Sequence, residues 1–147
     1  MDLLNVLTLF ATLLMIGVEL SVSLFLDPAI WRLNDHAITA ELDAVLGKVM
    51  PFWYGGCLVL LILEATLRRH QAGAAALALA ALLWLLSIVY TLAMLVPINN
   101  RIAASEPGSA WLIEHKRWDK LHRWRVGLLL VAAVAFVFGL GLLPIKA

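Results

Sequence analysis

Four long apolar stretches, separated by short polar segments, dominate the chain. They cover about residues 3–26, 49–67, 74–96 and 126–143. Each is close to the ~20 apolar residues that a helix needs to cross the ~30 Å hydrocarbon core of a bilayer. Because lipid offers the backbone no hydrogen-bond partners, all four stretches are predicted to be α-helices. The pattern predicts an all-α integral membrane protein, a four-helix bundle forming a single transmembrane domain over residues 1–147.

The segments between the spans add two further helical predictions. Residues 34–48 alternate apolar and polar positions at helical spacing, which predicts a short interfacial helix after the first span. Ser109 is a good N-cap, and a helix beginning there runs without a break into the fourth span. With about 30 residues at ~1.5 Å each, this long fourth helix is predicted to project from the membrane. The first and third spans are predicted to end at Asp27-Pro28 and at Pro97, because proline interrupts a helix.

Composition supports a membrane protein and excludes several other classes. Hydrophobic residues make up 63% of the chain and charged residues 14%, whereas soluble domains are about half apolar and a quarter charged. The net charge of +1 argues against a nucleic-acid partner. The start Met1-Asp2 has no basic segment, so the first stretch is predicted to be a retained span and not a signal peptide. We expect a multi-pass protein of the inner or plasma membrane, with its oligomeric state, including a homo-oligomer, left open.

The charges outside the spans bear on orientation. Four spans bring both termini and the loop at Arg68 to one end, called side A, and leave the other end as side B. Eight of the 11 lysines and arginines fall on side B. The positive-inside rule therefore places side B in the cytoplasm, although the short loop Arg68-Arg69-His70 argues for the opposite orientation.

Polar residues inside the first span follow one helix face. They are spaced by 3, 4, 7 and 4 residues, namely Asn5, Thr8, Thr12, Glu19 and Ser23. A charge near the bilayer centre costs ~2.5–3.5 kcal/mol even on lenient scales. Glu19 is therefore interpreted either as a proton-handling or ligand-binding group or as a protonated carboxyl that joins helices. Glu64, four residues before Arg68, is instead expected to form an ion pair with it.

A second group of polar and aromatic residues leads into the fourth span. One helix face carries, at steps of 4, 3, 4 and 3, the residues Trp111, His115, Trp118, His122 and Arg125. The tryptophans also fit an aromatic belt at the membrane surface, and His115 is expected to be structural. We predict a pocket opening to side B with Glu19 at its floor. The candidates around it are His122, Arg125, Trp118, Asn99, Asn100, Arg101, Trp53 and His36.

No motif in the sequence predicts a metal or nucleotide site. The helical metal-ligand spacings H-x-x-x-H and E-x-x-H are missing. His115 and His122 are seven residues apart, or ~10 Å along a helix, which is too far for one ion. We therefore predict no metal ligands, while a metal pairing through the fold, such as His36 with His122, stays as a less favoured alternative. The side chains of Asn99 and Asn100 also have an alternative structural role. They could cap backbone carbonyls that lack a hydrogen-bond donor because of Pro97.

Three segments, taken in order, resemble the anthrone oxygenase-like family of small four-helix membrane proteins. They are Phe25-x-x-Pro28-Ala29 after the first span, Val96-Pro97-Ile98-Asn99-Asn100-Arg101 after the third, and Trp118-x-x-Leu121-His122-x-x-Arg125 opening the fourth. The last two are the most specific, and the resemblance extends over nearly the whole chain. It implies an oxygenase that converts the ring CH₂ of a lipophilic anthrone- or quinol-like molecule to a carbonyl with O₂.

The resemblance also assigns roles to the candidate residues. Removing a benzylic proton makes an anthrone electron-rich enough to react with O₂ without a metal, so the cofactor is left open between none beyond O₂ and a metal ion. His122 or Glu19 is the expected general base. Asn100, Arg101 or Arg125 is the expected donor to the developing oxyanion, and Trp118 and Trp53 are expected to stack on the rings. Two alternatives remain, a non-catalytic carrier of a lipophilic molecule and a structural or regulatory membrane subunit.

Overall fold

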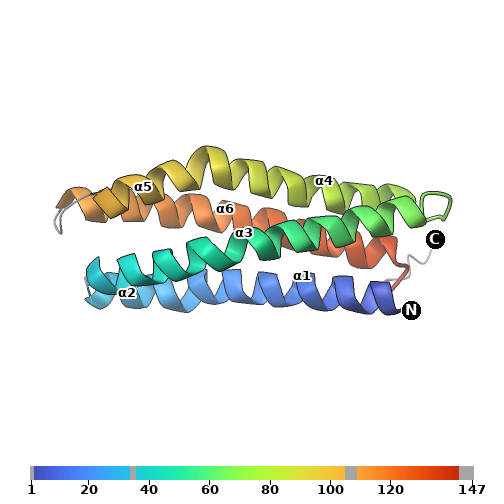
Figure 1. Cartoon of the computed structure of the whole chain (residues 1–147), viewed down its shortest axis with the longest axis horizontal. Coiled ribbons are helices and arrows are strands. Elements are labelled where there is room, and N and C mark those ends of the chain that lie inside the picture. The colour runs from blue at the N-terminus through green and yellow to red at the C-terminus, as the bar shows by residue number, and fades with distance from the viewer. Residues whose placement is uncertain (1, 34–35, 105–108, 143–147) are drawn as a thin grey trace.

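The computed structural model describes residues 2–33, 36–104 and 109–142, and these form four long antiparallel helical stretches (Figure 1). In chain order the elements are α1 (Leu3–Ser21), the π-helical segment η1 (Val22–Leu26), α2 (Asp27–Leu33), α3 (His36–Leu67), α4 (Ala74–Tyr90), the π-helical segment η2 (Thr91–Leu95), α5 (Val96–Ala104) and α6 (Ser109–Gly139). Four stretches are long and apolar enough to span a membrane, namely Leu3–Ile30, Val45–Leu67, Ala74–Ala104 and Trp111–Gly139. The predicted all-α four-span fold is confirmed.

The helices form a bundle in which α1 and α4 each pack against α3 and α6. The closest approach joins α4 and α6 at side A, where a Cβ added to Gly73 would overlap the backbone carbonyl of Gly139. A Cβ on Gly139 would in turn lie 2.7 Å from the side chain of Leu77. Only residues as small as these two glycines allow two helix backbones to come into contact in this way. Gly141, just after the fourth helix, has a φ of 71°, the left-handed conformation that commonly ends a helix.

The first and third spans continue past the prolines at which they were predicted to end. Both spans contain a π-helical segment that ends two residues before the proline, at Leu26 before Pro28 and at Leu95 before Pro97. At each segment the backbone N–H at the C-cap, Asp27 or Val96, bonds five residues back instead of four. The wider turn makes room for the proline ring and for the carbonyl that loses its N–H partner. Both spans therefore continue as helices beyond the prolines, as α2 and α5.

One of the connecting segments differs from the prediction. The backbone from His36 onward is helical as predicted, yet it runs directly into the second span, so no separate interfacial helix exists and α3 has 32 residues. The fourth helix begins at Ser109 as predicted and ends at Gly139. Its first turns pack against α2 and α5 in a cluster that includes Ile30, Ile98 and Trp111, and Figure 1 shows α5 beside them.

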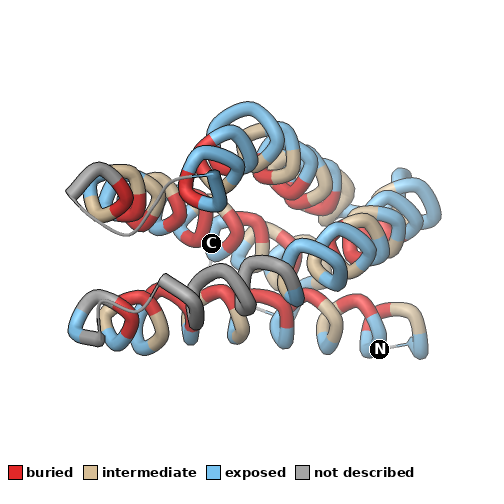
Figure 2. The backbone as a smooth tube through the Cα atoms, turned by 60° about the vertical axis from the view of Figure 1, so that its left-hand side comes forward, coloured by how far each residue is buried: buried red, intermediate tan, exposed pale blue. Residues whose placement is uncertain are grey.

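Two apolar cores lie one above the other along the bundle. The larger one, toward side A, includes Met15, Trp84 and Phe136. The smaller one, at side B, is built from Ile30, Ile98, Ile102 and Trp111. Figure 2 shows the buried positions facing inward and the exposed ones outward along every helix. The exposed faces are themselves apolar, with Phe10, Phe25 and Phe52 among them, which suits contact with lipid. Glu19, His122 and Arg125 meet in the region where the two cores adjoin.

Candidate functional site

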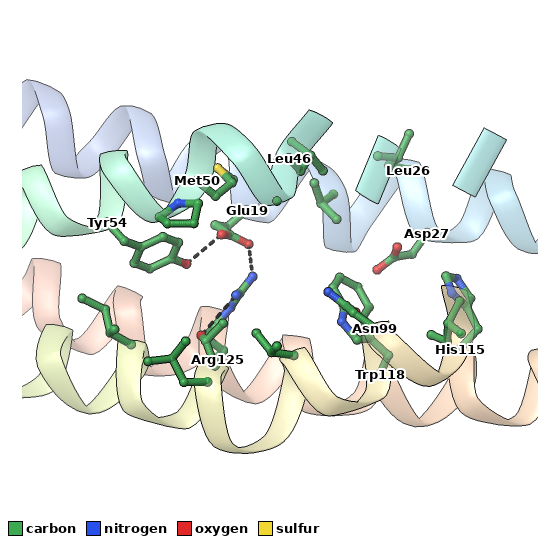
Figure 3. A pocket seen from close by; sticks show the side chains of 18 of the residues that line it. Glu19, Leu26, Asp27, Leu46, Met50, Tyr54, Asn99, His115, Trp118 and Arg125 are labelled. Atoms are coloured by element: carbon green, nitrogen blue, oxygen red, sulfur yellow. Dashed lines mark hydrogen bonds and ion pairs between the residues drawn. The ribbon is translucent and has the colours of Figure 1, made fainter. Parts of the chain in front are cut away.

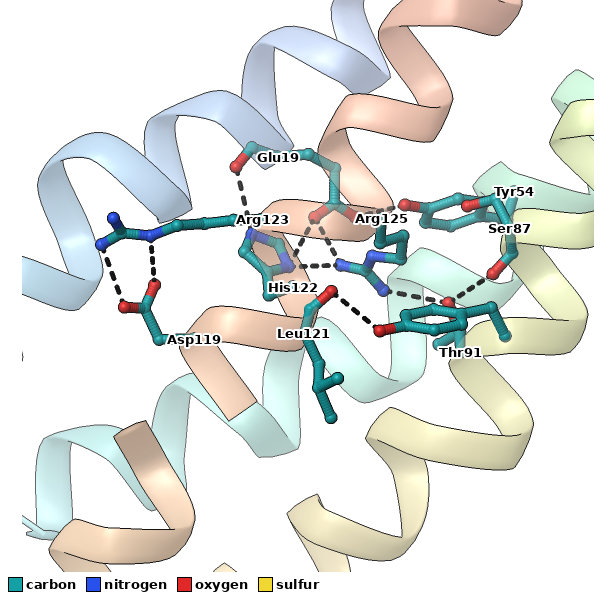
Figure 4. A network of polar contacts seen from close by, with 10 residues as sticks. Glu19, Tyr54, Ser87, Thr91, Asp119, Leu121, His122, Arg123 and Arg125 are labelled. Carbon is teal, nitrogen blue, oxygen red and sulfur yellow. Dashed lines mark hydrogen bonds and ion pairs between the residues drawn. The ribbon is translucent and has the colours of Figure 1, made fainter. Parts of the chain in front are cut away.

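An ion pair between Glu19 and Arg125 joins the first and fourth spans at the centre of the polar region (Figure 4). Arg125 Nη2 lies 2.5 Å from Glu19 Oε2. The two residues are 1% and 8% exposed, so solvent barely screens the pair. Glu19 therefore faces the interior of the bundle and has its charged partner on the fourth span. The other polar side chains of its helix face, Asn5, Thr8, Thr12 and Ser23, are buried too.

His122 contacts both members of this pair. Arg125 Nη2 donates to His122 Nδ1 at 2.9 Å, and His122 Nε2 lies 3.3 Å from the backbone oxygen of Glu19. Since a guanidinium has only donors, Nδ1 must be the unprotonated nitrogen, and Nε2–H then donates to the Glu19 carbonyl. A neutral imidazole in this tautomer links the backbone of α1 to the guanidinium on α6.

Two further side chains complete the cluster, and neither was selected from the sequence. The Tyr54 hydroxyl donates to Glu19 Oε1 at 2.7 Å, and the Arg125 guanidinium lies 5.5 Å from the centre of the Tyr54 ring. Thr91 Oγ1 accepts from Arg125 Nη1 at 3.2 Å and donates to the Ser87 carbonyl at 2.8 Å. Helical spacing offered a signal for Tyr54, which shares a buried face with Cys57. The choice of these partners, however, depends on how the four helices pack.

A cavity of about 360 Å³ lies beside this cluster, within the size range of small-molecule sites (Figure 3). All four helical stretches line it, mostly with apolar side chains. Its polar lining at one end comes from the Glu19–Arg125 cluster, with Tyr54 and Thr91. Toward side B it comes from Asp27, Asn99 and His115. A flat, apolar ligand with polar groups at both ends fits this arrangement.

Two buried N–H donors without a partner among the described residues belong to side chains that line this cavity. Arg125 Nε and Trp118 Nε1 are both buried and form no hydrogen bond within the described part of the chain. Both residues line the cavity. A buried donor left unpaired costs ~1–3 kcal/mol, so a ligand acceptor that reaches either group gains that energy on binding.

Aromatic rings form a continuous column along one face of α6. Trp111, His115, Trp118 and His122 follow one another with ring centroids 5.5, 6.3 and 4.6 Å apart. The angles between successive ring planes are only 14°, 11° and 10°. Trp111 is 1% exposed, so it belongs to the core and not to an aromatic belt. The middle of the column gives the cavity a flat aromatic wall at Trp118.

The cavity opens sideways between α3 and the η2–α5 stretch. The lining residues that are also exposed are Gly47 and Pro51 on α3, and Leu92 and Val96 on the opposite side. All four are apolar or lack a polar side chain. The lining side chains from the first and fourth spans are instead buried or half-buried. An apolar molecule therefore meets an apolar entrance on the outer surface of the bundle.

The residues predicted for the site separate into three groups. Glu19, Arg125, Asn99 and Trp118 line the cavity. His122 is fully buried behind the ion pair, and Trp53 donates to the Ala11 carbonyl at 3.2 Å, so neither is among the residues that line it. Asn100 and Arg101 are exposed, and Arg101 pairs with Glu114 at 3.1 Å. These two point away because α5 continues as a helix past Pro97, which leaves Asn99 as the inward residue. The side chain of His36 lies outside the described residues.

Metal-ligating side chains are scattered over the part of the chain that the structure describes. Among these residues, no three His, Cys, Asp or Glu side chains are grouped so that they could hold a metal ion. Glu64, a further buried acid of the spans, forms its predicted ion pair with Arg68 at 2.9 Å. That pair lies at side A, away from the cavity.

The fold and the site define a class, a multi-pass membrane protein whose four-helix bundle encloses a ligand-sized cavity beside a buried ion pair. The model of the anthrone oxygenase family matches residues 44–135, well over half of the chain. The protein therefore belongs to the anthrone oxygenase family. The matched segment contains Tyr54, Thr91 and Arg125, while Glu19 and Asp27 precede it. No curated protein and no solved structure gives a significant match.

Proposed function

We propose that this protein is a membrane oxygenase that converts the ring CH₂ of a lipophilic, anthrone-type aromatic to a ketone with O₂. One oxygen atom enters the ketone, and the other leaves as water with the two hydrogens of the CH₂ group. Family membership supports the reaction class. The observation that carries the proposal is the unpaired Nε–H of Arg125, a buried cation facing an apolar cavity.

The chemistry requires a place for negative charge to develop. Loss of a proton from the CH₂ group of an anthrone moves charge onto the carbonyl oxygen across the ring. Donors already aimed at that oxygen stabilise it, and they act more strongly where water is excluded. Arg125 Nε and Trp118 Nε1 are the unpaired donors in the described cavity wall. The resulting electron-rich anion passes an electron to O₂, and the two radicals combine at the former CH₂ carbon.

Glu19 and His122 are proposed to position Arg125. Both carboxylate oxygens of Glu19 already accept hydrogen bonds, from the Tyr54 hydroxyl and from Arg125. His122 is not among the cavity-lining residues, and its Nδ1 accepts a hydrogen bond from Arg125. Groups occupied in this way hold the guanidinium at a fixed angle, which leaves Nε directed at the ligand. This arrangement replaces the base role predicted for them from the sequence.

The substrate is proposed to enter from the bilayer. The entrance between α3 and the η2–α5 stretch is apolar, and Leu92 beside it is 62% exposed. A lipophilic aromatic that has partitioned into lipid reaches this opening without crossing water.

Oxygen uptake with a simple anthrone tests the proposal. The variant Arg125→Lys keeps the positive charge but removes Nε and the planar fork. We expect it to lose about 10²–10³-fold in kcat, as for loss of an oxyanion donor. Arg123→Lys is the matched control, because the Arg123 side chain is 59% exposed and pairs with Asp119 outside the cavity.

The same assay separates the alternatives. Binding of a planar quinone, followed by quenching of tryptophan fluorescence, reports on the cavity without turnover. Wild-type protein that binds the quinone but consumes no oxygen is a carrier, and the oxygenase proposal is then wrong. Equal oxygen uptake by the wild type and Arg125→Lys would show that Arg125 has no part in the reaction.

A further inference from the structure

The proposed reaction needs a proton acceptor as well as the oxyanion donor that the Glu19–Arg125 cluster supplies at one end of the cavity. In an anthrone the CH₂ carbon and the carbonyl oxygen lie on opposite edges of the central ring. The base and the oxyanion donor therefore have to stand at opposite ends of the bound ring system. With Arg125 as the donor, the base belongs at the far end of the cavity, toward side B.

Asp27 stands at that end. It opens α2, is 3% exposed and lines the cavity, and Figure 3 shows its carboxylate pointing into the space beside Asn99 and Trp118. Apart from Glu19, it is the only carboxylate among the described lining residues. Eight residues separate the two acids, which is ~12 Å along a helix. The two ends of the cavity are thus far enough apart for a ring system between them.

The π-helical segment explains why both acids face the same space. In an unbroken α-helix, a residue eight positions on points about 80° away from the first. The segment η1 lies between Glu19 and Asp27 and takes up one extra residue, or roughly 100° of rotation. The two side chains therefore return to nearly the same direction. The π-helical segment η1, which accommodates Pro28, therefore also directs Asp27 into the cavity.

We propose that Asp27 is the general base of this site, a role that rests on the proposed oxygenase function. Its carboxylate takes one proton from the CH₂ group, and the electron pair of that C–H bond moves into the ring system toward the oxygen held by Arg125. After the anion has combined with O₂, the protonated Asp27 returns this proton to the peroxide. The carboxylate then takes the second C–H proton as the O–O bond breaks. The hydroxide that leaves accepts this proton and departs as water.

Deuterium exchange without oxygen isolates the step. An anthrone deuterated at the CH₂ group is incubated with the full-length protein in detergent under anaerobic conditions, and loss of deuterium is followed by mass spectrometry. We expect the wild type to accelerate exchange and Asp27→Asn to reduce that acceleration about 10²–10⁴-fold, the usual contribution of a positioned base. Asp119→Asn is the matched control, since Asp119 is another buried acid but pairs with Arg123 away from the cavity.

Two further measurements keep the test decisive. Quinone binding by fluorescence shows whether Asp27→Asn still folds and binds, and Asp27→Glu, which keeps a carboxylate, is expected to restore part of the exchange. Exchange by Asp27→Asn at the wild-type rate overturns the role of Asp27, and so does a wild type that accelerates no exchange. If Arg125→Lys abolishes oxygen uptake while Asp27→Asn retains it, the proposed function stands and the base lies elsewhere.

Discussion

The ion pair between Glu19 and Arg125 makes a quantitative prediction about stability. Replacing Arg125 with Met removes the cation and leaves a carboxylate that is 1% exposed, with the Tyr54 hydroxyl and, at 3.5 Å, His122 Nδ1 as its polar side-chain neighbours among the described residues. Breaking a buried pair in this way costs ~3–5 kcal/mol. Replacing both partners by Met removes the buried charge altogether and is often close to neutral. We therefore expect the double variant to recover most of the loss.

A surface pair provides the comparison. Arg101 and Glu114 also form an ion pair, at 3.1 Å, but their side chains are 49% and 28% exposed. Exposed pairs contribute ~0.2–1 kcal/mol, because water and salt screen them. Arg101→Met is accordingly expected to change the free energy of unfolding by less than about 1 kcal/mol.

Reversible unfolding in mixed micelles, followed by tryptophan fluorescence, measures these free energies. The Glu19–Arg125 cycle should show strong coupling, with the double variant far more stable than the sum of the single losses. If the losses in free energy of unfolding were additive, the two buried charges would not stabilise each other and this reasoning would be refuted. A cost for Arg125→Met no larger than that of Arg101→Met would refute the burial argument itself.

Three other predictions concern packing, access and pH. Gly73→Ala should destabilise the protein by about 1–3 kcal/mol in the same unfolding assay, because the new methyl group meets the backbone of α6, whereas Gly17→Ala meets nothing within 4 Å. Gly47→Trp should slow quinone binding by obstructing the entrance, and stopped-flow fluorescence should show no such effect for Gly17→Trp. The hydrogen bond from the Asn5 backbone N–H lowers the pKa of Asp2 from its ordinary value of 3.8, so its contribution to stability is present above that pH and is lost as the pH falls below it. Asp2→Asn should remove this acid dependence from unfolding titrations.

Hydropathy alone was sufficient for the four spans, because a bilayer leaves a long apolar segment little choice but a helix. It also placed Glu19 inside the bundle, since no other position is tolerable for a charge in that stretch. The ends of the spans were predicted less well. The prediction that proline ends a helix assumes α-helical hydrogen bonds. It does not hold for the π-helical segments before Pro28 and Pro97. Packing of α2 and α5 against the start of α6 supports the extra turns.

The membership of the site depended on contacts between helices. His122 and Arg125 are three residues apart and share a face, so the sequence predicted both for the cavity, yet only Arg125 reaches it. The longer Arg125 side chain reaches the cavity, while the His122 imidazole is enclosed against α1. Asp27 and Tyr54 carry no motif that marks them, and they join the site because η1 rotates one and α3 brings in the other. Local pattern thus determined which segments are helices and which faces turn inward, whereas the cavity and its chemistry arose only where four such faces met.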